Sequence, residues 1–83
     1  MEIYRSARKH GIGDEDINHA VDHAVVSADS DDGKVLHLGP DRAGNLLEVV
    51  TVLRDDGTEI AIHAMRMRRM YEGFLPRRGS DDG

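Results

Sequence analysis

Two apolar β-type runs joined by a short polar turn are the strongest constraint on the fold of this chain. Residues 46–54 form the longest run rich in Val and Leu, and residues 58–64 follow after Asp56-Gly57. Asp-Gly between two such runs is typical of a β-hairpin. If these two residues alone form the turn, Arg54 faces Glu59 across the hairpin, and opposite charges in register favour the pairing.

This register assigns the side chains of the hairpin to two faces, because side chains alternate along a strand. Glu48 and His63 share one face, diagonally across the hairpin, together with Val50, Val52 and Ala61. We expect the other face to pack on a helix, and it comprises Leu47, Val49, Thr51, Leu53, Ile60, Ile62 and Ala64.

A single amphipathic helix is predicted over residues 14–28. Asp14 is a good N-cap, and Glu15 and Asp16 place negative charge near the positive end of the helix dipole. Apolar residues then recur at spacings of three and four, which is the pattern of one buried helix face. That stripe comprises Ile17, Ala20, Val21, Ala24, Val25 and Ala28.

The remaining segments complete a small α+β fold. Residues 5–10 predict a helical turn, residues 34–38 a short strand, and residues 65–74 a terminal helix. We therefore expect an amphipathic helix packed on a small antiparallel three-stranded sheet, with a short N-terminal helical turn and a short C-terminal helix. Residues 1–76 form a single domain, and the polar residues 77–83 are expected to be a disordered tail.

Size and charge limit the function classes. A chain of 83 residues buries only a small core, and with no cysteine it has neither disulfides nor thiolate metal sites. Its apolar runs are far too short to span a bilayer, and its N-terminus lacks a secretory signal, so we expect a cytoplasmic protein. The net charge of −5 argues against non-specific coating of nucleic acid.

The order of several short segments resembles a known family. They are Lys9-His10-Gly11-Ile12 before an acid-capped amphipathic helix, Leu38-Gly39, Leu46-Leu47 opening a long β run, and Ile62-His63-Ala64 before an Arg-rich segment closing on Tyr71. In this order they resemble the BrnT-type toxins of bacterial type II toxin–antitoxin pairs, a branch of the RelE-like ribonuclease superfamily. The resemblance covers roughly residues 7–72.

The resemblance implies a toxin that inhibits translation by cleaving RNA. It also implies that cleavage needs neither a metal nor another cofactor, and that a small DNA-binding antitoxin neutralises the protein. We expect a homodimer or a toxin–antitoxin heterotetramer, and no association with a membrane.

Such cleavage needs a base for the 2′-hydroxyl proton, an acid for the leaving 5′-oxygen, and cations for the charge on phosphorus. The predicted catalytic residues are Glu48 and His63 for proton transfer and Arg66 and Arg69 for phosphate. The predicted RNA-binding residues are Lys9, His10, Arg42, Arg68 and Tyr71.

Each of these residues also has a structural interpretation. The arginines can be solvated, His63 can pair with Glu48 for stability alone, and Tyr71 can be a core residue. His19 and His23 have the spacing of metal ligands on a helix, but no third ligand is obvious beyond Asp22, and we predict no metal site.

An alternative function is a non-catalytic protein-interaction module with the same fold. Met65 stands where the BrnT-type toxins usually have arginine, and the net negative charge also favours this alternative. The acidic residues 14–32 are either a solvated surface or a docking surface for a basic antitoxin.

Overall fold

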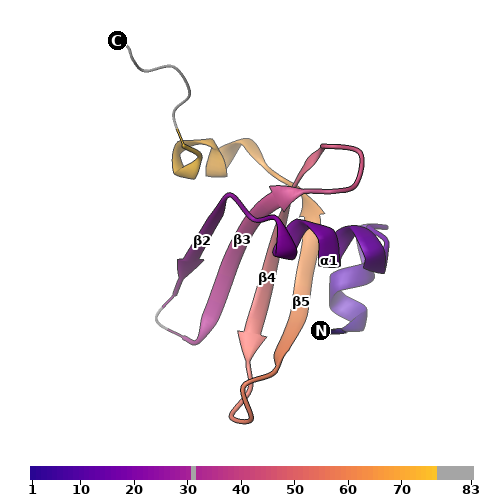
Figure 1. The fold of residues 1–83 in the computed structure, drawn as a ribbon, viewed down its shortest axis with the longest axis vertical. Coiled ribbons are helices and arrows are strands. Elements are labelled where there is room, and N and C mark those ends of the chain that lie inside the picture. Colours follow the sequence, from indigo (N-terminus) through magenta and orange to yellow (C-terminus); the bar gives the residue numbers. More distant parts are fainter. Residues whose placement is uncertain (31, 77–83) are drawn as a thin grey trace.

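The computed structural model describes residues 1–30 and 32–76, and the predicted tail 77–83 lies outside this range. Five strands form one sheet in the order β1-β5-β4-β3-β2 (Figure 1). The elements in chain order are β1 (Glu2–Ile3), the 3₁₀ helix η1 (Arg5–Arg8), α1 (Asp14–Asp22), β2 (Val26–Asp29), β3 (Lys34–Pro40), β4 (Leu46–Leu53), β5 (Glu59–Arg66) and the 3₁₀ helix η2 (Arg69–Phe74).

The prediction of a three-stranded sheet is wrong. The three expected strands are present as β3, β4 and β5, but β2 pairs antiparallel with β3, and β1 pairs parallel with β5. Among the described residues α1 is the only α-helix. The fold is therefore a five-stranded mixed sheet with one α-helix packed on it.

The predicted helix over residues 14–28 begins at Asp14 but ends at Asp22. Asp14 is not its N-cap: Gly13 takes that position, and the Asp14 carboxylate binds Arg8 instead. The Val25 N–H donates to the Leu38 carbonyl, and Val26–Asp29 then pairs along β3. The same segment also carries apolar residues at strand spacing, because Val26 and Ala28 alternate and share one face. Of these two, only Ala28 belongs to the predicted helical stripe. Pairing with β3 decides between the two patterns, as tertiary contacts often override local preference.

Of the two short helices predicted on either side of the central elements, one is present and the other is not. The N-terminal helical turn is confirmed as η1, and Gly11 follows it with φ +79° and donates to the Arg8 carbonyl. The terminal helix over residues 65–74 is wrong, since β5 continues to Arg66 and only the 3₁₀ helix η2 follows.

The three antiparallel hairpins share one turn geometry. In each, the residue before the loop and the residue after it are joined by an N–H to carbonyl bond, and a glycine N–H closes the turn. These glycines all adopt φ between +82° and +91°, which is accessible to glycine at little steric cost. The glycines are Gly33, Gly44 and Gly57.

This turn geometry corrects the predicted register of β4 and β5. The loop holds three residues rather than two, so Val52 pairs with Ile60 and Thr51 pairs with Ala61. A bulge at residue 62 then shifts the register by one, and Val50 pairs with His63, as predicted. Ala61 consequently belongs to the face that packs on the helix, and Ile60 to the other face.

The core lies between the sheet and the helices α1 and η1. Figure 1 shows α1 crossing one face of the sheet near one end of the strands, in contact with β3 and β4. Gly39 permits this close approach, because a Cβ on it would lie 2.0 Å from the Ala20 carbonyl oxygen. The core cluster comprises Ala7, Ile17, Ala20, Leu47, Val49, Ala61 and Ala64.

The sheet therefore has two different faces. The covered face packs against α1 and carries Leu47 and Val49. The open face points away from α1, and by strand alternation it carries Glu48 and Val50 of β4. Ionisable side chains lie on both faces, but in different surroundings.

Candidate active site

A buried carboxylate organises a polar cluster on the open face. Glu48 lies in the middle of a β run and has no exposed surface. Its partners come from the neighbouring strand β5 and from the segment that leads out of β5 toward η2. We call the cluster of Glu48, His63, Arg68, His10 and Tyr71 the open-face site.

His63 and Arg68 both bind the Glu48 carboxylate directly. His63 Nε2 lies 2.9 Å from Glu48 Oε2, and Arg68 Nη2 donates to the same oxygen at 2.8 Å. The backbone N–H of Arg68 donates to Glu48 Oε1 at 2.9 Å. These bonds satisfy a carboxylate that would otherwise be costly to bury.

The same contacts determine the charge of Glu48. Burial raises its pKa, but hydrogen bonds from Arg68 and His63 more than offset this, so that the pKa of Glu48 is lower than its ordinary value. The hydrogen bond to this carboxylate in turn raises the pKa of Arg68. Glu48 is therefore ionised at neutral pH and holds the two neighbouring side chains in fixed positions.

His63 is the member of the site best placed to react with a ligand. Its side chain is 29% exposed, whereas Glu48 is fully buried. Nε2 is used by Glu48, and within residues 1–30 and 32–76 no protein group forms a hydrogen bond with Nδ1. A carboxylate that fixes one nitrogen of a partly exposed imidazole, while the other nitrogen is left without a protein partner, is the arrangement of an oriented general base.

Two aromatic rings complete the site. The His10 ring meets the His63 ring edge to face, with centroids 5.8 Å apart. The Arg68 guanidinium lies 5.8 Å from the centroid of the Tyr71 ring. A second imidazole, a cation and an aromatic ring are thus adjacent to the oriented imidazole.

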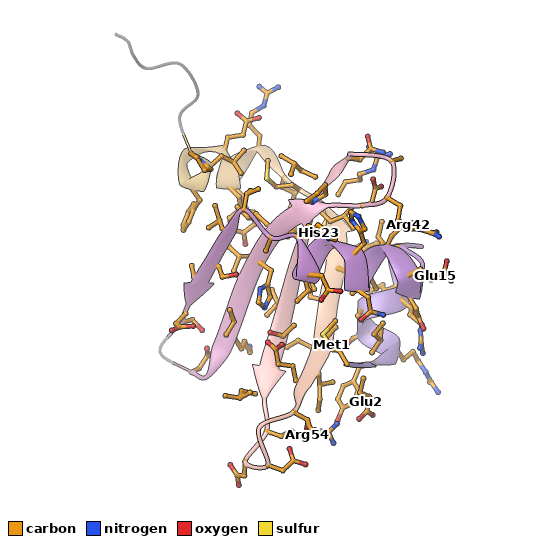
Figure 2. The ribbon with its side chains drawn as sticks, viewed as in Figure 1. Met1, Glu2, Glu15, His23, Arg42 and Arg54 are labelled. Atoms are coloured by element: carbon orange, nitrogen blue, oxygen red, sulfur yellow. The ribbon has the colours of Figure 1, made fainter. Side chains whose placement is uncertain are left out.

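The structure does not bring every predicted site residue to this place. Arg66 pairs with Leu47 and so belongs to the covered face. Arg42 binds Asp16 and Glu15 at the start of α1, and Figure 2 shows Arg42 beside Glu15. The hydrogen bonds of Arg42 also lower the pKa of Asp16.

Arg69 and Lys9 are exposed neighbours of the site rather than members of it. Arg69 begins η2, and Lys9 follows η1 directly before His10. Neither forms an ion pair in the part of the chain that the structure describes. The cation in the open-face site is therefore Arg68, which the sequence indicated only as an RNA-binding residue.

A second polar network, centred on His37, lies on the covered face and was not among the predicted site residues. Ser27 Oγ lies 3.0 Å from His37 Nδ1, and His37 Nε2 lies 3.0 Å from Thr51 Oγ1. The Thr51 hydroxyl donates to Glu59 at 3.0 Å. Both nitrogens of this buried imidazole are occupied, so the network is suited to stability rather than to proton transfer.

The helical histidine pair also has a structural explanation. The His19 and His23 rings stack at 4.1 Å, and His19 Nδ1 lies 2.8 Å from the Pro40 carbonyl oxygen. Across residues 1–30 and 32–76 no three His, Cys, Asp or Glu side chains are grouped to hold a metal ion. The pair instead links α1 to the end of β3.

Comparisons with known proteins give no match to this chain: no family model, curated protein or solved structure is similar to it. None of the helices in the described residues is long and apolar enough to cross a membrane.

Proposed function

We propose that this protein is a metal-independent endoribonuclease of the kind found in type II toxin–antitoxin pairs, acting on cytoplasmic RNA. The observation that carries the proposal is His63, held through Nε2 by a buried, ionised Glu48 and flanked by the ring of His10. Imidazole is the side chain that most readily exchanges protons near neutral pH. Two imidazoles side by side can serve as the base and the acid of one reaction.

The reaction follows from this arrangement. His63 Nδ1 takes the proton of an RNA 2′-hydroxyl, and the 2′-oxygen forms a bond to the adjacent phosphorus. The bond from phosphorus to the 5′-oxygen breaks, and protonated His10 gives its proton to that oxygen. The products are a 2′,3′-cyclic phosphate and a free 5′-hydroxyl, and no metal or other cofactor takes part.

Arg68 supplies positive charge to the same place. Its Nε and Nη2 groups bind Glu48, whereas Nη1 takes no part in these bonds, and the side chain is 48% exposed. A guanidinium never loses its charge near neutral pH, so it can stabilise the charge that builds up on the phosphate oxygens. This role falls to Arg68 instead of Arg66 or Arg69, the residues that the sequence favoured.

The test is cleavage of a defined single-stranded RNA by purified protein in the presence of a chelator. We expect products that end in a 2′,3′-cyclic phosphate, and a rate lower by about 10²- to 10⁴-fold for His63→Ala. His23→Ala is the matched control, because His23 is an exposed histidine that follows directly on α1, outside the site. A folded, partner-free protein that cleaves no RNA would refute the proposal, as would an unchanged rate for His63→Ala.

A non-catalytic interaction module is the second candidate. It is favoured by the engagement of Arg68 with Glu48 and by the placement of Arg42 and Arg66 away from the site. Under this proposal the protein still binds a partner such as a small basic antitoxin, but its expression does not arrest growth. Growth arrest that disappears with His63→Ala and persists with His23→Ala would favour the enzyme.

A further inference from the structure

A depression on the open face lies directly beside the open-face site. It has a volume of about 560 Å³, and Val50 and Tyr71 are among the residues that line it. Val50 is the register partner of His63, and Tyr71 is the aromatic ring next to Arg68. The depression and the proposed catalytic groups therefore share one continuous surface.

The floor and wall of the depression differ in chemistry. Ala28, Leu36 and Val50 are register neighbours on β2, β3 and β4, and they form an apolar floor. Tyr71 reaches this floor from η2 and gives it one aromatic wall. A flat apolar floor with an aromatic ring at its side fits a planar ring better than it fits a branched aliphatic group.

The far end of the depression carries an ion pair. Lys34 and Asp32 both line it, and the Lys34 ammonium group lies 3.4 Å from the Asp32 carboxylate while the Lys34 side chain stays 49% exposed. Lys34 is four residues before Leu38, which pairs with Glu48, and this spacing along a strand corresponds to about 13 Å. A short piece of extended single-stranded RNA can reach from the open-face site to this ammonium group.

We propose that the depression binds an unpaired nucleobase of the RNA substrate, stacked on Tyr71, with Lys34 close to the phosphate of a neighbouring nucleotide. This inference rests on the proposed function and adds the form of its substrate. Single-stranded RNA is recognised through stacking of splayed bases on aromatic side chains and through cations along the backbone. A base inside a duplex cannot enter the depression, so the substrate is single-stranded at the cleavage site.

The experiment uses a short RNA that the protein can bind but cannot cleave. Methylation of every 2′-hydroxyl removes the attacking group, and one 2-aminopurine reports stacking through a fall in its fluorescence. For the wild-type protein we expect binding with fluorescence quenching. Tyr71→Ala should weaken binding by about 5- to 150-fold, which corresponds to the usual contribution of one base–aromatic stack.

Three further variants make the result specific. Tyr71→Phe keeps the ring and should bind nearly as wild type, and Tyr4→Ala removes the other, exposed tyrosine and should have no effect. Ala28→Leu fills part of the floor and should weaken binding while Tyr71 remains in place. A duplex of the same sequence should not compete.

The outcomes separate this inference from the proposed function. Equal binding by wild type and Tyr71→Ala, or binding without quenching, overturns the base site even if the protein cleaves RNA. Failure of the wild type to bind the oligonucleotide also overturns it, as does a dimer in solution that buries the depression. Quenching that depends on Tyr71, in a protein that cleaves nothing, supports the base site and refutes the proposed enzyme.

Discussion

The covered face and the open face of one sheet each hold a histidine, but in opposite surroundings. On the covered face, the buried His37 uses both ring nitrogens in hydrogen bonds to Ser27 and Thr51. On the open face, His63 is partly exposed, and among the described residues only its Nε2 has a hydrogen-bond partner. A fully satisfied imidazole contributes to stability, whereas a half-satisfied and accessible one is available for chemistry.

The two faces also differ in what covers them. The covered face is closed by α1, which can approach because Gly39 has no side chain. On the open face Glu48 is buried with the help of the Arg68 side chain, which is itself half exposed. Changes on the covered face should therefore affect mainly stability, and changes on the open face should affect activity as well.

The largest expected effect is from Gly39→Ala on the covered face. The new Cβ would lie 2.0 Å from the Ala20 carbonyl oxygen and 2.9 Å from the Ala24 Cα, and both are backbone atoms that cannot turn away. We expect a loss of about 3 kcal/mol or more in the free energy of unfolding, measured by urea denaturation. Gly13→Ala is the control, because nothing lies within 4 Å of its Cβ position, and an equal loss in both variants would contradict the packing argument.

Glu48→Ala on the open face should have the next largest effect on stability. It removes the hydrogen bonds to His63 and Arg68, and we expect a loss of about 2–3 kcal/mol in the free energy of unfolding. RNA cleavage should fall as well, because His63 loses its orientation. Glu48→Gln keeps the shape without the charge and should be intermediate in stability; normal cleavage in folded Glu48→Ala would argue against the oriented base.

Thr51→Val should distinguish most clearly between an effect on stability and an effect on cleavage. It replaces the central hydroxyl of the covered-face network by a methyl group and leaves His37 Nε2 and Glu59 without this partner. We expect a loss of about 1–2 kcal/mol in stability and an unchanged cleavage rate per folded molecule. A change in the pH profile of cleavage would show that the two faces are coupled.

The pH dependence of stability should show the smallest effect. The pKa of Glu48 in the folded protein is below its ordinary value of 4.5, so its contribution is fully present above that pH. It is lost as the pH falls through the lower, folded value. Urea denaturation at a series of pH values below neutral should therefore show that the free energy of unfolding falls less steeply with pH for Glu48→Gln than for wild type. An identical fall in the two proteins would contradict a lowered pKa.

Local patterns predicted much of the fold, and the errors have identifiable causes. The strands β3, β4 and β5 follow from β-type composition, whereas the N-cap of α1 is Gly13 and not the predicted Asp14. The segment after Asp22 holds apolar residues at helical spacing (Val25 and Ala28) and at strand spacing (Val26 and Ala28), so that only pairing with β3 assigned Val26–Asp29 to β2. The hairpin register near Gly57 failed because a two-residue and a three-residue turn use the same Asp-Gly sequence.

The candidate site was predicted in part. The sequence placed Glu48 and His63 diagonally on one face, and the structure places them 2.9 Å apart. Arg68 rather than Arg66 lies next to Glu48, because strand alternation turns Arg66 toward the covered face while the chain leaves β5 before Arg68. No local pattern reports the direction of a chain after its strand ends.

The sequence alone determined the three central strands β3, β4 and β5, where the glycine turns lie, and that a carboxylate and an imidazole share one face of a hairpin. These properties depend on spacing and on backbone preferences of nearby residues. Only the tertiary structure decided which arginine reaches that carboxylate, which ring lies against the imidazole, and which face α1 leaves open. Those properties depend on contacts between residues far apart in the chain, such as His10 with His63, which follow from packing of the whole domain.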